Sequence, residues 1–364
     1  SDMNDWRYQG AAMLGRFTED SQISVILNGN NTNNRGFNDV AGSMMGGMRG
    51  GGGGMGRGMG GWGRGNGITT SWMGGLNGAF TLMDDNMDLA GNYLYNGSVN
   101  DVAEEVSKIT YLDDGSRLIN NESGTSTTAT QGNRFGIRLE HKFSENTSIL
   151  FEPQVNFGHG SYNENSIFDT YTENGDARNL TNSGYTRNSG DNENWSTSGF
   201  LLFRQRIGKP GRTISANVRY SFSNNDMRGI NQSLTEARDA QTGAVSQDIV
   251  DQNFDQNSKS SSISGRVVYT EPIGKHLFLE ANYQYGWSRN TSFKNTYDIA
   301  TGELDSRYSN EILNRSITQR AGLNFSYQKE KFRAQLGASM NPTDTYNKTT
   351  GHDEYRSKVI NWSP

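Results

Sequence analysis

The chain has 364 residues, a formal net charge of -5 and no cysteine, which excludes disulfides, thiolate metal sites and a basic footprint for nucleic acid. Only 32% of the residues are hydrophobic, and no apolar run approaches the roughly 20 residues that a membrane-spanning helix needs. Gly, Asn, Ser, Thr and Tyr are abundant, which favours strands and turns, while 16 Tyr, 16 Phe and 6 Trp argue against disorder.

Two hairpins are predicted near the N-terminus. Residues 10–17 and 22–30 alternate apolar and polar side chains across a short polar turn, and residues 68–82 and 87–97 repeat the arrangement. A period of two is the pattern of a strand with two different faces, and two such runs around a short turn indicate a hairpin.

The segment between these hairpins, residues 42–67, is rich in Gly, Met and Arg. Its methionines could offer thioethers to a soft ion such as Cu(I), but a metal site needs fixed geometry and glycine maximises chain entropy. We therefore predict an extracellular loop that forms no regular structure over 46–67. Such a loop would become ordered against a plug, a lid or a partner.

Four further hairpins follow along the chain. Their strand pairs are 133–143 with 148–157, 199–207 with 212–222, 262–272 with 276–287, and 317–327 with 332–340. About twelve strands in six hairpins are thus predicted, in an all-β antiparallel fold. Pro153 interrupts one run and requires a bulge or an unpaired sheet edge, because proline cannot donate to the ladder.

The lengths of the connections indicate the kind of β-structure. Turns within hairpins are short, whereas tens of polar residues lie between hairpins, as over 160–192 and 225–257. This is the layout of an outer-membrane barrel with short periplasmic turns and long extracellular loops, and a β-sandwich is rarely so uneven. The stretch from Leu277 to Trp287 would span roughly 23 Å at a tilt of about 45°, close to the apolar band of such barrels.

The alternation assigns side chains to the lipid and to the interior. Six residues are predicted to face lipid: Leu277, Leu279, Ile137, Leu139, Val218 and Leu336. Arginine at Ile137 or Leu279 is expected to cost roughly 2 to 4 kcal/mol near the midplane and much less near the rims. Tyr283, Tyr285 and Trp287 are expected at the loop-side interface, where aromatic rings keep one end in water.

Several stretches carry a family resemblance. "GNGITTSWMGGLNGAF", "NYLYNGS", "NRFGIRLEHKFSENTSILFEPQVNF" and the closing "NWSP" resemble the outer-membrane β-barrel family related to TonB-dependent receptors in Bacteroidota. The resemblance runs over nearly the whole chain and implies a single barrel domain over 1–364 in the cell outer membrane. It also implies a large barrel preceded by a carboxypeptidase-regulatory-like domain and a plug.

No catalytic, cofactor or metal site is predicted. His141, His159, His276 and His352 have no metal-ligand spacing, and no Ser/His pair is marked for hydrolysis. The acidic pairs Asp84–Asp85 and Asp113–Asp114 could ligate calcium, but solvated turns explain them more simply.

Charges on the predicted polar faces are the more informative group. They are Arg138, Glu140, Lys142, Arg204, Arg206, Arg219, Arg266, Glu280, Arg320 and Arg333. Mixed signs argue against a simple ion-selective pore. A wall that docks a folded plug and a water-filled lumen that tolerates charge are equally compatible with them.

The sequence therefore favours the wall of a TonB-dependent receptor-like transporter for ligand uptake, without enzyme activity. Its expected partners are outer-membrane lipid, a plug, a TonB-type energy-coupling partner or a surface lipoprotein. A non-transporting barrel that serves as scaffold or subunit of a cell-surface complex is the alternative, and a soluble or fibrous adhesin is a third class. The chain is also expected to be one part of a larger, 22-strand-type barrel, with a further strand after residues 354–364.

Overall fold

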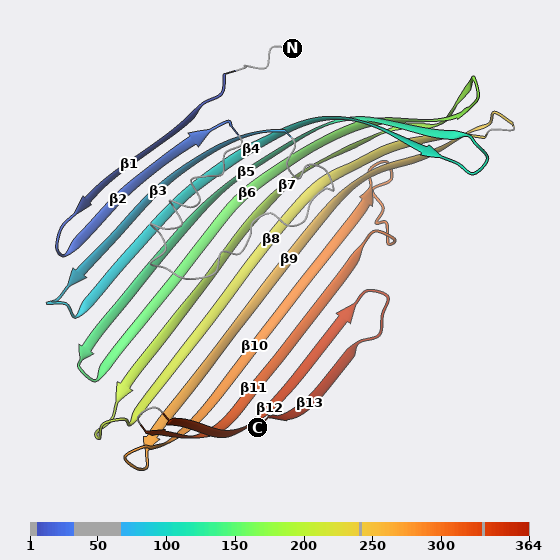
Figure 1. Cartoon of the computed structure of the whole chain (residues 1–364). Coiled ribbons are helices and arrows are strands. Elements are labelled where there is room, and N and C mark those ends of the chain that lie inside the picture. The colour runs from blue at the N-terminus through green and yellow to red at the C-terminus, as the bar shows by residue number, and fades with distance from the viewer. Residues whose placement is uncertain (1–5, 33–66, 240–241, 330–331, 364) are drawn as a thin grey trace.

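The computed structural model describes residues 6–32, 67–239, 242–329 and 332–363, which form strands and turns (Figure 1). The strands are β1 (Gln9–Phe17), β2 (Ser21–Asn30), β3 (Ile68–Leu82), β4 (Met87–Tyr111), β5 (Arg117–Ser144), β6 (Thr147–Asn174), β7 (Ala177–Arg206), β8 (Thr213–Arg238), β9 (Val245–Pro272), β10 (Leu277–Asp298), β11 (Asn310–Lys329), β12 (Phe332–Thr349) and β13 (Tyr355–Ser363). They make one 13-stranded antiparallel sheet in which each strand pairs with its neighbours in the chain. In the described part, no helix is long and apolar enough to cross a membrane.

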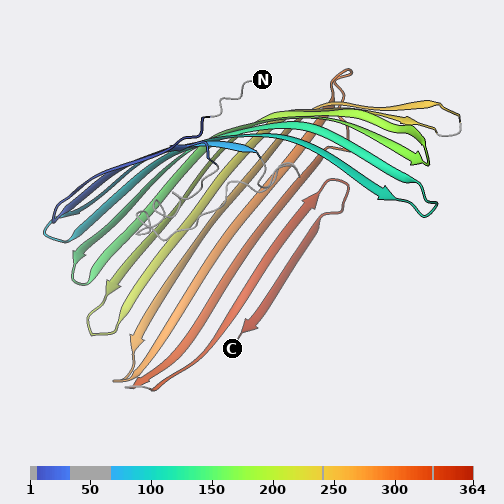
Figure 2. The same cartoon turned by 45° about the horizontal axis from the view of Figure 1, so that its top comes forward.

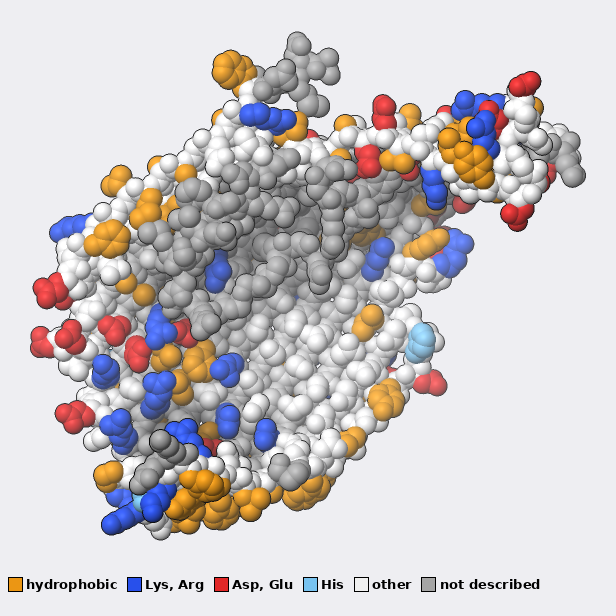
Figure 3. Space-filling model, in the orientation of Figure 1, with side chains coloured by type: hydrophobic (Ala, Val, Ile, Leu, Met, Phe, Trp, Pro, Cys, Tyr) orange, Lys and Arg blue, Asp and Glu red, His pale blue; other side chains and the backbone are white. Residues whose placement is uncertain are grey.

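The register of the sheet separates an apolar face from a polar face. Leu279 pairs with Phe325, which pairs with Leu336, so these side chains share one face. The same face runs across the other strands, and all six residues predicted to face lipid lie on it. Leu336 is 75% exposed there, whereas Asn282 on the opposite face is buried. The sheet curves into a trough, and its hollow is the polar face (Figures 2 and 3).

The apolar face forms a band of nearly constant height. On β8 apolar side chains run from Ile214 to Phe222, and the next side chain on that face is Asn224. On β10 the run is Leu277 to Trp287, followed by Arg289. Eight to ten residues span about 26–33 Å along a strand, or about 19–23 Å at the usual tilt, as expected for the apolar band of an outer-membrane barrel.

The prediction of long loops over 160–192 and 225–257 is wrong. Apart from the short connections between β6 and β7 and between β8 and β9, the described residues of both segments are in strands. The hairpins from β4 to β9 project far beyond the apolar band (Figures 1 and 2). We call this extension, residues 98–130, 158–192, 225–239 and 242–257, the arm. Both of its faces contact water, so its strands need no apolar alternation, and the sequence pattern that identifies lipid-facing strands is missing.

One smaller expectation also needs correction, and another is confirmed in part. The sheet has thirteen strands and not about twelve, because the segment expected to lead into a further strand is itself β13. Its face carries Arg356 and Lys358 beside Ile360 and Trp362, a mixture that conceals the alternation. No bulge is found at Pro153, but the other alternative holds on one side: the β5–β6 ladder is unpaired beside Pro153, while Pro153 pairs with Gly199 on β7.

The predicted extracellular loop over 42–67 lies outside the described residues except for Gly67, which is in no strand. The strand ends that flank it, at Asn30 and Ile68, point toward the same end of the sheet as the turns of the arm.

Strands β1 and β13 are the two edges of the sheet. Each pairs with one neighbour only, and no pair joins them within the described residues. Figure 2 places them on opposite sides of the trough.

Single cysteines can test the two faces, because the chain has none of its own. With the protein in lipid vesicles, a charged maleimide should label Asn217→Cys and Gln284→Cys on the polar face, since a thiol in water ionises and reacts. It should leave Val218→Cys and Tyr285→Cys unlabelled on the apolar face. Equal labelling of Asn217→Cys and Val218→Cys, measured by mass spectrometry, would show that the assignment of the faces is wrong.

Candidate functional site: the polar wall and the arm

A partly buried ion-pair cluster lies on the polar face of β5, β6 and β7. Arg138 donates to Glu152 at 2.5 Å and to Glu140 at 2.9 Å, and Arg204 reaches Glu140 at 4.0 Å. The exposed fractions of the Arg138, Glu140 and Glu152 side chains are 35%, 25% and 32%, so water screens the cluster only in part. Arg138 and Glu140 lie two residues apart on β5 and therefore share one face. The pairs Gly136–Gln154 and Leu139–Phe151 on either side bring Glu152 of β6 beside Arg138 on that face.

Neutral groups extend the cluster along the wall. Arg134 donates to Gln154 at 2.9 Å, Gln154 donates to Asn156 at 3.1 Å, and Asn156 donates to Ser196 at 3.2 Å. A second group forms around Glu280, which accepts from Asn324 at 3.2 Å. The wall is therefore a continuous polar surface whose groups largely satisfy one another.

Further cations on this wall have no acidic partner. All ten charges predicted to face inward lie on the polar face. Lys142, Arg206, Arg266, Arg320 and Arg333 form no ion pair within the described residues. Figure 3 shows Lys and Arg side chains gathered over the hollow. Such a surface can attract an anionic ligand or an acidic segment of a partner.

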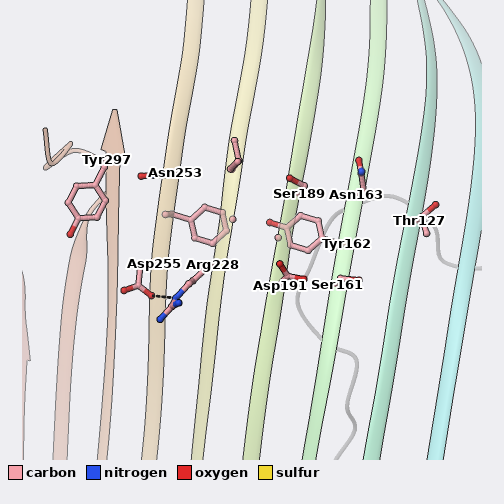
Figure 4. Close-up of a pocket in the computed structure, with 14 residues that line it drawn as sticks. Thr127, Ser161, Tyr162, Asn163, Ser189, Asp191, Arg228, Asn253, Asp255 and Tyr297 are labelled. Carbon is pink, nitrogen blue, oxygen red and sulfur yellow. Dashed lines mark ion pairs between the residues drawn. The ribbon is translucent and has the colours of Figure 1, made fainter. Parts of the chain in front are cut away.

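The arm carries an open groove of about 670 Å³ on the continuation of the apolar face (Figure 4). One row of its lining runs across six strands: Thr127, Asn163, Ser189, Ile230, Asn253 and Tyr297. Arg228 and Asp255 form an ion pair of 3.9 Å in the next row, where Asp191 lies 3.9 Å from His159. Amides, hydroxyls and charges of both signs suit a polar, hydrogen-bonding molecule.

Two glycines form the floor of this groove. A Cβ atom at Gly190 would lie 2.6 Å from the carbonyl oxygen of Arg228 and 2.7 Å from the Tyr162 ring. At Gly229 it would lie 2.7 Å from the Phe254 ring. The rings cover the glycines from the polar face, so this close approach leaves no room for a side chain.

The pKa of the Glu122 carboxyl group in the arm is raised by its surroundings. Burial raises the pKa of Glu122, and the negative charge of Glu104 raises it further, while a hydrogen bond with Ser166 acts in the opposite direction. A raised pKa disfavours the charged form of this carboxyl group.

The remaining candidates from the sequence are not brought together. His141 lies beside Phe143 and the carbonyl oxygen of Asn86, and His276 lies in a turn beside Tyr327. Asp114 accepts two hydrogen bonds from Ser116, which lower its pKa.

Within the described residues, no group of three or more His, Cys, Asp or Glu side chains could hold a metal ion. Sequence reasoning missed the groove because it treated these residues as loops. The glycines and aromatic residues spaced along them were the available signal.

Comparison with known proteins identifies the setting of this sheet. Residues 205–364 match the model of the "Outer membrane protein beta-barrel family". No curated protein sequence matches the chain. The chain is located in the outer membrane, which agrees with the height of its apolar band.

Three solved structures are similar in a limited way. They are the outer membrane protease OmpT from Escherichia coli (11% identity, TM-score 0.21, covering 76% of this chain and 93% of that one), the translocator domain of autotransporter NalP from Neisseria meningitidis (10%, 0.20, 82% and 81%) and the closed form of the ferric-catecholate import receptor Fiu from E. coli K12 (11%, 0.26, 99% and 64%). Similarity at this level carries no functional argument.

Proposed function

We propose that this chain forms part of the wall of a TonB-dependent receptor-like outer-membrane transporter for ligand uptake. The observation that carries the proposal is the polar hollow of the sheet. Along the height of the apolar band, its wall carries ion pairs and, beside them, cations that form no ion pair. A wall of this kind lets a polar ligand pass a membrane whose core excludes charge.

The proposed transporter is larger than the described sheet. The unpaired edges of β1 and β13 would each expose backbone groups in lipid, at several kcal/mol per group. We propose that further strands complete a barrel of the 22-strand type around a plug, and that a TonB-type partner supplies energy. Interior cations then dock the plug or guide an anionic ligand.

Uptake can be tested without knowing the ligand. Culture medium of the host bacterium, with the gene intact or deleted, would be compared by untargeted mass spectrometry. The intact strain should deplete at least one class of compound that the deletion strain leaves in the medium, and an uncoupler of the proton gradient should abolish that difference. Identical depletion by both strains would overturn uptake and favour the alternative, a non-transporting scaffold or subunit of a surface complex.

A further inference from the structure

The apolar face carries a row of cations directly beyond its band. Arg289 lies two residues after Trp287 on β10 and pairs directly with Arg315 on β11. Arg315 in turn pairs with Tyr346 on β12, and Tyr346 pairs with Arg356 on β13. Four neighbouring strands therefore present Arg, Arg, Tyr and Arg in one line across the sheet.

Neighbouring positions add to the positive charge. We call the whole group the basic belt: Lys259, Arg289, Arg315, Lys348, Arg356 and Lys358. Lys259 and Lys348 lie one row farther from the band, and Lys358 lies in the row of Trp287. The belt is confined to β9–β13, because the residues in the same two rows on the neighbouring strands are uncharged: Phe222 and Asn224 on β8, Thr197 and Trp195 on β7, and Val155 and Phe157 on β6.

Half of the belt lacks an acidic partner. Asp344 pairs with Arg356 at 2.8 Å and with Lys358 at 3.8 Å, and Glu354 pairs with Lys348 at 3.3 Å. In the described part of the chain, Lys259, Arg289 and Arg315 form no ion pair, although the guanidinium of Arg315 lies over the Tyr346 ring at 5.7 Å.

Two arginines in directly opposed positions destabilise a sheet unless an anion lies between or beside them. On the apolar face, immediately beyond the aromatic end of the band, the surrounding medium is the headgroup layer of the membrane. Phosphate is the group that arginine recognises best there, because its planar fork matches two phosphate oxygens.

We infer that the basic belt binds the phosphate groups of anionic membrane lipid, with Arg289 and Arg315 as the central contacts. The belt fixes the height of the sheet in the bilayer on the β9–β13 side. This inference rests on the location of the chain in the outer membrane and is independent of what the chain transports.

The test uses the whole protein in neutral detergent, titrated with phosphatidylglycerol carrying brominated acyl chains. Bromine quenches tryptophan, and Trp287 lies at the end of the band, two residues before Arg289 of the belt. We expect saturable quenching that weakens with salt. In the double variant Arg289→Gln/Arg315→Gln, the apparent Kd should rise on the order of 30-fold, since each cation near an anionic surface contributes about a factor of five.

The matched control is Arg266→Gln/Arg320→Gln, which removes the same charge from β9 and β11 on the polar face, where both residues pair with Gln284. It should bind phosphatidylglycerol like the unaltered protein. Brominated phosphatidylcholine should not distinguish the three proteins, and inorganic phosphate at equal concentration should not compete. Equal weakening in both double variants, or competition by inorganic phosphate, would overturn lipid recognition by the belt. Neither result would bear on the separate proposal that the chain takes part in ligand uptake.

Discussion

Replacement of Val218 by arginine is expected to destabilise the protein in lipid by about 2–4 kcal/mol, because the side chain lies midway along the apolar band of β8, between Ile214 and Phe222. A guanidinium there must leave water or distort the bilayer around it, and the polar face is out of its reach. The free energy of unfolding can be measured by urea titration in phospholipid vesicles, with tryptophan fluorescence as the signal.

The matched control is Ser221→Arg, three residues along the same strand on the polar face. Ser221 pairs with Ser198 and Ser262, so the new charge meets no like charge directly opposite and extends into the hollow. Its cost should stay below about 1 kcal/mol, as for ordinary surface substitutions. Similar costs for the two variants would mean that both faces of β8 have the same surroundings.

Membrane geometry explains which part of the fold could be predicted from the sequence. Lipid on one face and water on the other require strict alternation, so the hairpins around Ile137, Val218 and Leu279 and both of their faces are readable residue by residue. All ten inward charges were found for the same reason.

The arm could not be predicted in this way. With water on both faces, its strands are held by ladder hydrogen bonds and by ring–glycine contacts such as Tyr162 over Gly190. Those contacts join residues from different strands, and the sequence alone does not give the register between strands.

Because the register between strands is needed, the basic belt and the ion-pair cluster could not be predicted from the sequence either. Residues 299–309 connect β10 to β11, and the length of this connection does not give the register. Only the pairing of β10 with β11 places Arg289 opposite Arg315. Arg138, Glu140 and Glu152 could be assigned to one face from the sequence, but not to one contact.

That contact leads to the second large expected effect. Arg138→Gln should destabilise the protein by about 1–2 kcal/mol, because it leaves the Glu140 and Glu152 carboxylates facing each other without their shared cation. Loss of one partner of a fully buried pair costs more, but partial exposure of these side chains reduces the effect. The same urea titration in vesicles measures it.

A double-mutant cycle separates the ion pair from other effects of the substitution. Glu152→Gln in the Arg138→Gln background removes one of the two stranded charges, so the double variant should recover part of the lost stability, with a coupling energy of about 1 kcal/mol. Arg204→Gln is the control within the cluster: its side chain is 55% exposed and 4.0 Å from Glu140, so its loss should change stability little. Strictly additive costs for Arg138 and Glu152 would mean that the short contact between them contributes nothing, and that the wall is organised by its ladder hydrogen bonds alone.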